Sequence, residues 1–277
     1  MTPSALRDSA RYRGHEQMRA PWGWALAGLC CGVLGAALVC APSVWMERAA
    51  NAMGQGRVVL SDSTGTVWSG SAQLALSGGQ GSRDAVRLPG RLYWVVGLGW
   101  GHVKIALSAD CCTAGPIRLQ LAPSIGWPLV RGWHLQVHSS ESTWPAALLA
   151  GLGTPWNTVR AEGSLGVSTS GFSIHTALDR VVMEGSVQLD ARDMRSSLST
   201  LAPLGSYRLL LTGGEQPALV LTTLGGALQL QGHGQWTAGR LRFEGEASAA
   251  PSHQQELSNL LNIMGRRDGV RSRINIG

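Results

Sequence analysis

Two patterns of hydrophobic and polar residues divide the chain. The first is an uncharged run over residues 22–41, WGWALAGLCCGVLGAALVCA. About 20 residues at about 1.5 Å of rise each would span about 30 Å as a helix, which matches the hydrocarbon thickness of a membrane. Trp22 and Trp24 begin the run and Trp45 follows its end, at the depths that amphipathic rings prefer. The run therefore predicts a transmembrane helix.

Three other interpretations of this run fit less well. A buried helix of a soluble protein would normally carry a polar face, which is missing here. A signal peptide could be cleaved after Ala41, but Pro42 follows directly and the run is longer than a usual signal core. A lipoprotein anchor would use Cys40, yet Val39 stands where processing prefers a small residue. We therefore expect an uncleaved anchor.

Flanking charges predict the orientation of this anchor. Arg7, Arg11, Arg13 and Arg19 precede it, whereas Arg48 alone follows closely. Under the positive-inside rule the N-terminal tail stays in the cytoplasm and the rest is exported. The expected parts are a cytoplasmic tail over residues 1–20, a transmembrane helix over 21–45, a linker over 46–56 and a periplasmic domain over 57–277.

The second pattern is an alternation of apolar and polar residues that begins after the linker. The segment 117–121, IRLQL, is one example. About fourteen such runs follow one another, mostly spaced by turn signals at about 8–12 residues. Because no βαβ rhythm interrupts them, we expect an antiparallel sheet rather than a parallel one. The pattern predicts a mainly β protein, with a large meander-rich antiparallel domain that forms either a curled sheet or a sandwich.

Three segments break the alternation and are expected to form short helices, over residues 144–152, 194–201 and 254–264. The third follows Pro251 and Ser252, has apolar residues at helical spacing and ends at Gly265. The apolar faces of these helices would plug the open end or the concave side of a sheet.

Charge and motif content exclude several function classes. The exported part carries 19 Arg and Lys against 15 Asp and Glu, without the concentrated basic stripe and interleaved aromatics of a nucleic-acid binder. The glycines of residues 97–101 lack the spacing and the lysine of a phosphate loop. No G-x-S-x-G elbow exists, and Asp190 and Asp193 are expected to be turn or cap residues. We expect no enzyme, no cofactor and no nucleic-acid partner.

Histidines and cysteines are the other candidates for chemistry. His134 and His138 are four apart on an expected strand, which separates them by about 13 Å, too far for one metal ion. No cysteine or carboxylate cluster with ligand spacing accompanies them, so no metal site is expected. Cys30, Cys31 and Cys40 lie in the anchor as small apolar side chains.

Cys111 and Cys112 are adjacent and lie on the expected oxidising side of the membrane. No other exported cysteine is available to pair with either one. Three states are open: free thiols, a cross-link to another chain, or a vicinal disulfide. A vicinal disulfide would pin the turn between the expected strands at 102–110 and 117–124.

The C-terminal segment is basic. It carries Arg266, Arg267, Arg271 and Arg273 with only Asp268 opposing them. This segment is a candidate contact for an acidic partner or for anionic lipid headgroups. The alternative is a solvated, charged edge strand that resists aggregation.

Several motifs in colinear order carry a family resemblance. They are GTVWSGSA at 65–72, GSYRL at 205–209, GHGQW at 232–236, RLRFEGEA at 240–247 and the closing segment 257–267. With the preceding anchor they resemble the type II secretion system protein N family, also called general secretion pathway protein N. The Cys111-Cys112 pair is not part of that pattern.

The resemblance implies an inner-membrane protein of Gram-negative bacteria, in the machinery that moves folded proteins from the periplasm across the outer membrane. It implies an accessory of the inner-membrane platform and of the outer-membrane secretin. The residues agree with this, because an anchored β domain without catalytic residues is what a non-enzymatic scaffold or tether requires, and its anchor would contact membrane lipid. The family offers no catalytic or cofactor residues to carry over.

The alternative function is a lipid- or hydrophobe-binding β groove of the cell envelope, similar to the AsmA-like proteins. Its basis is the series of apolar strand faces in a chain with only two Phe and three Tyr to fill an interior. Bound phospholipid or a wide dry trough would favour this function, whereas a packed two-sheet sandwich without a trough would exclude it.

Overall fold

The computed structural model describes residues 22–79, 81–82, 84–126, 129–154, 156–177, 180–237 and 240–276. The chain divides into two compact units, Met1–Ala41 and Pro42–Gly277. The expected cytoplasmic tail at residues 1–20 lies outside the described residues.

The first unit contains helix α1 (Trp22–Val39), 18 residues without a charged side chain. None of its residues is buried by protein, and its length and composition suit a membrane crossing. It therefore fits a single-pass membrane anchor. The helix ends at Val39, before Pro42, and α2 (Val44–Met53) is a separate helix that belongs to the second unit.

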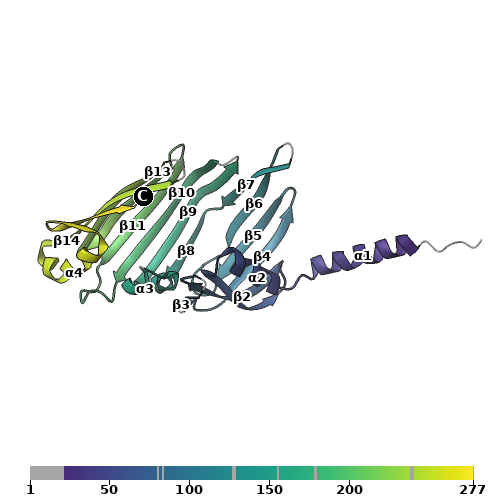
Figure 1. Ribbon diagram of the computed structural model, residues 1–277, viewed down its shortest axis with the longest axis horizontal. Helices are drawn as coiled ribbons and strands as arrows, with labels where there is room; N and C mark the ends of the chain where they lie inside the picture. Colours follow the sequence, from purple (N-terminus) through teal and green to yellow (C-terminus); the bar gives the residue numbers. More distant parts are fainter. Residues whose placement is uncertain are drawn as a thin grey trace, which may run out of the picture. The chain divides into compact units, whose positions relative to one another are not determined.

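The second unit is built on one antiparallel sheet that is not closed (Figure 1). The described strands are β1 (Val58–Gly65), β2 (Ser69–Ser77), β3 (Ala85–Arg87), β4 (Leu92–Gly99), β5 (His102–Ala109), β6 (Ile117–Gly126), β7 (Leu129–Val137), β8 (Ser140–Pro145), β9 (Glu162–Ala177), β10 (Arg180–Arg195), β11 (Gly205–Gly214), β12 (Ala218–Gly226), β13 (Leu228–Thr237), β14 (Arg240–Ala249), β15 (Arg266–Asp268) and β16 (Arg271–Ile276).

Strand order follows the sequence almost throughout: β1-β2-β4-β5-β6-β7-β9-β10-β11-β12-β13-β14-β16-β15, with β3 beside β2 and β8 beside β9. The predicted mainly β, meander-rich antiparallel fold is confirmed. The sheet is the open form of the two that alternation allowed, because the described strands form a single sheet rather than a pair of packed sheets.

The two longest strands, β9 and β10, join the halves of the sheet. The second half of β9 pairs with β7 and its first half pairs with β8. Where these halves meet, Gly171 and Gly185 have positive φ and the β9–β10 register shifts. A Cβ on Gly185 would collide with the Gly171 carbonyl, so the bulge requires glycine there.

The short helices gather at one end of the strands (Figure 1). They are α2, η1 (Ala146–Leu152), α3 (Trp156–Val159), η2 (Pro251–His253) and α4 (Gln254–Met264). Buried apolar clusters form beneath them: Leu60 and Trp94 pack near α2, and Leu204 and Leu228 pack under α4. The helices predicted at 144–152 and 254–264 are thus confirmed, the first as a 3-10 helix.

The helix predicted at residues 194–201 is wrong. Met194 and Arg195 complete β10, and the following residues are irregular. The Ser196 hydroxyl donates to the Val159 carbonyl at 2.6 Å and accepts from the Leu198 amide at 3.2 Å. These local bonds satisfy the backbone without a helix, while Leu198 and Leu201 still pack against the buried cluster under α4.

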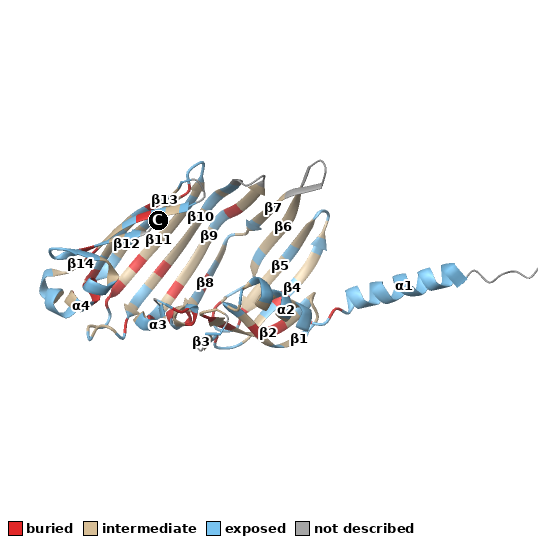
Figure 2. Ribbon diagram, viewed as in Figure 1, coloured by how far each residue is buried: buried red, intermediate tan, exposed pale blue. Residues whose placement is uncertain are grey.

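The two faces of the sheet differ in polarity. One row of directly paired residues crosses six strands, from β4 to β10, and contains only large aliphatic side chains: Leu98, Val103, Leu121, Leu135, Ile174 and Met183. We call this the aliphatic row and the side that carries it the apolar face. The alternate positions, such as Lys104, Gln120 and Gln136, form the polar face. Figure 2 shows that the middle strands are mostly half-buried rather than buried.

Candidate interaction surfaces

The predicted basic segment forms the hairpin β15–β16 at one edge of the sheet. Arg273 pairs with Asp268 at 2.8 Å and Arg271 pairs with Glu246 at 3.1 Å. All four of these side chains except Glu246 are more than half exposed, so water screens both ion pairs and each contributes little to stability.

Arg267 has a structural role within this edge. Its guanidinium donates to the Ser258 carbonyl and to Asn262 Oδ1, both at 3.1 Å, and thereby ties the hairpin to α4. An open hollow of about 1000 Å³ lies beside the hairpin, and its charged lining is mixed: Arg266, Arg267, Arg273, Glu244, Glu246 and Asp268. Because the signs balance, the arginines do not form a purely basic patch, and their contact with a partner or headgroups stays a prediction.

The two edges of the sheet differ in what they leave open. At β1, the side chain of Asn51 binds both the amide and the carbonyl of Leu60, at 2.8 and 3.2 Å. The side-chain amide of Asn51 thus satisfies the Leu60 backbone groups that a neighbouring strand would otherwise pair with. At the other edge, β15 pairs only with Arg271–Arg273, so residues 274–276 of β16 have no strand partner on that side among the described residues. Such an edge can accept a strand from another protein.

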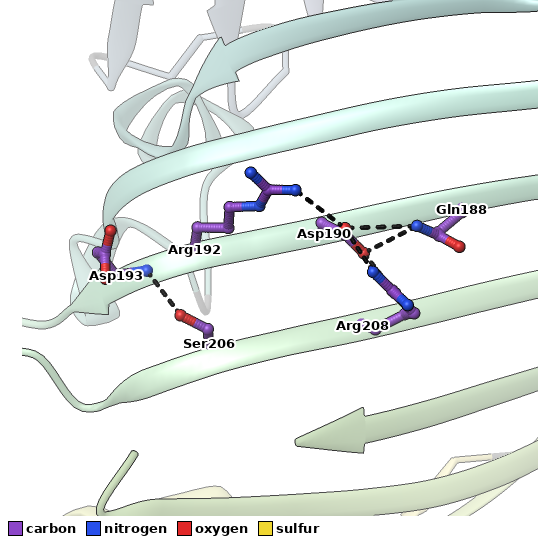
Figure 3. Close-up of polar contacts among 6 residues, drawn as sticks. All are labelled: Gln188, Asp190, Arg192, Asp193, Ser206 and Arg208. Atoms are coloured by element: carbon purple, nitrogen blue, oxygen red, sulfur yellow. Dashed lines mark hydrogen bonds and ion pairs between the residues drawn. The ribbon is translucent and has the colours of Figure 1, made fainter. Parts of the chain in front are cut away.

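A polar cluster lies on the polar face of β10 and β11 (Figure 3). Asp190 is only 5% exposed, and its carboxylate accepts hydrogen bonds from both Nε and Nη2 of Arg208, at 2.7 and 2.9 Å. Arg192 and Gln188 also donate to this carboxylate, at 3.4 and 3.2 Å. The bond from Arg208 is the main cause that lowers the pKa of Asp190, against the opposing effect of burial.

This cluster corrects one expectation from the sequence. Asp190 is neither a turn nor a cap residue but the centre of a cross-strand ion pair. Asp193 does lie at an irregular position, with φ of 50° at a β10 bulge, and its amide donates to Ser206 Oγ. The carboxylate of Asp190 is held ionised by arginine, so it is poorly suited to accept a proton at neutral pH. The cluster therefore stabilises the sheet rather than forming an acid and base pair.

The adjacent cysteines lie at the end of β5. A disulfide joins Cys111 and Cys112 in the structure. Cys112 is buried against Leu88, Ala109 and Leu148, and its carbonyl accepts from the Thr143 amide of β8 at 2.8 Å. The turn that carries the pair therefore also contacts β8, which sequence reasoning did not predict.

A family comparison decides the relationship of this chain to known proteins. The model of the family "Type II secretion system (T2SS), protein N" matches residues 56–274. This chain belongs to the type II secretion system protein N family. The match begins within the turn before β1 and ends within β16, so it covers the sheet except for the last two residues of β16. No curated protein and no solved structure matches the chain.

Membership of the protein N family identifies the chain as a component of a protein transport system. The family is a structural component of the type II secretion machinery and is not known as an enzyme. Membership also implies contacts with other type II secretion components. The resemblance in the sequence motifs is thereby confirmed.

The histidines of this chain do not form a metal centre in the part that the structure describes. His134 stacks on His175 of the neighbouring strand, with ring centroids 3.9 Å apart. His138 lies beyond the end of β7, with its Nε2 3.3 Å from Gln120 Nε2. Among the described residues no group of three or more His, Cys, Asp or Glu side chains could hold a metal ion.

Proposed function

We propose that the chain is a non-enzymatic inner-membrane component of the type II secretion machinery. Its sheet stands in the periplasm and acts as a scaffold or tether during the export of folded proteins across the outer membrane. The family match over residues 56–274 is the observation that carries this proposal.

The architecture supports a tethering role. Helix α1 fits a single-pass anchor, and only residues 40–43 separate it from α2, the first element of the sheet unit. Four residues reach at most about 14 Å. The sheet would therefore start close to the membrane surface, while the free edge of β16 lies at the opposite end of the strand order. A partner strand added there would be held by backbone hydrogen bonds.

Orientation and location can be tested with fusions to the full chain. Alkaline phosphatase folds in the periplasm, whereas green fluorescent protein exported by the general pathway does not become fluorescent there. A phosphatase joined after Gly277 should be active in membrane fractions, and a fluorescent protein at the same position should be dark. The opposite result, or recovery of the chain from the soluble cytosol, would contradict the proposal.

The role in secretion requires a genetic test. Deletion of the gene should leave folded type II substrates in the periplasm, and the full-length chain should restore their release. Unchanged secretion in the deletion strain, or accumulation of substrates in the cytoplasm, would count against a role in outer-membrane export.

A further inference from the structure

The aliphatic row forms an elongated apolar surface. Six strands at a spacing of about 4.8 Å extend over about 24 Å. Along the strands the row is flanked on the same face by Val96, Ile105, Leu119, Val137 and Phe172, which are themselves paired across β4 to β9. The strand pairing alone thus builds a continuous apolar patch.

None of the described helices forms a core cluster with the aliphatic row itself. The row belongs to none of the four described core clusters, which lie beneath the helices at the end of the strands. Leu98 at one end of the row is 70% exposed, the neighbouring Trp133 is 51% exposed, and the other five residues of the row are half-buried. A contiguous apolar patch that stays partly open to solvent is a common mark of a binding site.

The chemistry of the patch selects an occupant that needs no hydrogen bonds. The row contributes no polar side chain, and the backbone of its inner strands is paired on both sides. The hydroxyl of the neighbouring Thr176 is already hydrogen-bonded to the backbone of Trp133. It accepts from the Trp133 amide at 2.9 Å and donates to the Trp133 carbonyl at 3.2 Å. A peptide loop placed there would bury unpaired amide and carbonyl groups at a considerable cost, whereas a hydrocarbon chain would not.

The chain itself indicates where such a hydrocarbon would come from. Met46 and Ala50 of α2 pack against the cluster that contains Trp94 of β4. From Trp94 the apolar face continues along the same strand through Val96 to Leu98, where the aliphatic row begins. Helix α1, which fits a membrane anchor, ends only four residues before α2. An apolar path therefore starts close to where the bilayer would be.

We propose that the aliphatic row binds the acyl chains of membrane phospholipid. An acyl chain spans one leaflet, about 15 Å, so one chain can lie across the row within its length. The bilayer tethered to α1 is the supply of lipid. This activity goes beyond the proposed secretion role and does not depend on it, because it rests only on the sheet and its anchor.

The register of β6 and β7 provides a matched test. Leu121 pairs with Leu135 on the apolar face, and the preceding and following residues, Gln120 and Gln136, pair on the polar face. A benzophenone amino acid is placed at one of these four positions of the full-length chain in living cells. After irradiation, the purified protein is weighed by mass spectrometry. Phospholipid adducts are expected at positions 121 and 135 and should be absent at positions 120 and 136.

Two further positions keep the test decisive. Leu98 is the most exposed residue of the row, so a benzophenone there does not disturb packing and should also capture phospholipid. The same group at Leu34 in α1 shows that lipid adducts can be detected. Adducts with a second copy or with another protein at positions 98, 121 and 135 would overturn the proposal. Equal lipid capture on both faces, or none on the apolar face, would also overturn it.

Discussion

Asp190 shows how one carboxylate can fix the register of two long strands. It faces Arg208 directly across the β10–β11 ladder and accepts two parallel hydrogen bonds from it. A shift by one residue would carry Arg208 to the opposite face and leave a nearly buried carboxylate without its main partner. The ion pair therefore contributes modestly to the free energy of folding and also favours one register of the two strands.

We predict that Asp190→Asn destabilises the sheet at neutral pH. The neutral amide loses the charge-assisted bonds from Arg208, and because that arginine is 39% exposed, we expect a loss of only about 1–2 kcal/mol. The folded pKa of Asp190 lies below its ordinary value of 3.8. Its contribution is therefore complete above that value and is lost as the pH falls through the lower, folded pKa.

Denaturant unfolding of the full chain in detergent measures this difference. Parent and Asp190→Asn should differ at pH 7 and converge as the pH falls through the folded pKa of Asp190, which lies below its ordinary value of 3.8. Asp193→Asn is the matched control, since asparagine tolerates the positive φ at this position and the carboxylate makes no described ion pair. A difference that persists unchanged in acid would show that the charge of Asp190 is not responsible.

The cysteines give a second prediction at the scale of single residues. Cys30, Cys31 and Cys40 are free in the structure, whereas Cys111 and Cys112 are joined. Protein unfolded without reductant should therefore take up a thiol reagent at three cysteines, and after reduction at all five. Cys111→Ser should add one reactive thiol without reductant. Five reactive thiols in the unreduced parent, or a reducible dimer, would indicate one of the other two states.

At the scale of elements, β13 and β14 depend on an aromatic ring that lies over glycines. A Cβ built on Gly232 would lie 2.5 Å from Phe243 Cζ and 2.9 Å from the Glu244 carbonyl oxygen. A Cβ on Gly234 would lie 3.1 Å from the same ring. The glycines therefore make room for the phenylalanine, which is buried on the apolar face.

Gly232→Ala should therefore destabilise the sheet by about 1–3 kcal/mol, because the ring and the β14 backbone must both move. Gly225→Ala in β12 is the control, since a Cβ there meets nothing within 4 Å. It should be neutral or slightly stabilising, because alanine restricts the unfolded chain. Equal effects of the two substitutions in thermal unfolding would show that the contact with Phe243 is not limiting.

The elements were predictable wherever one local pattern governs them. Alternation indicated the strands, and Pro251 with Gly265 bounded α4. The failure at residues 194–201 has a physical cause: its spacing of Leu198 and Leu201 suits a helix, but Ser196 bonds to Val159, which is distant in sequence. The Asp190 cluster was missed for the same reason, because Arg208 is opposite it only through a register that sequence alone does not provide.

At the scale of the whole molecule, alternation could not distinguish an open sheet from a sandwich. Both arrangements need one apolar side chain at every second position, and they differ only in what covers that face. Helices cover this face at one end of the strands, whereas the aliphatic row lies outside the four described core clusters and is half-buried, with Leu98 exposed. The family match assigns this open sheet to the type II secretion machinery, but it does not identify the molecules that the sheet contacts.

The central claim is that the sheet is a structural part of the secretion machinery. The most direct measurement is isolation of the full-length chain from native membranes in mild detergent, after photo-cross-linking from the exposed Asn275 at the free edge of β16. We predict cross-links to components of the inner-membrane platform or to the secretin, identified by mass spectrometry. A chain recovered without any secretion component, from cells that are actively secreting, would contradict the account.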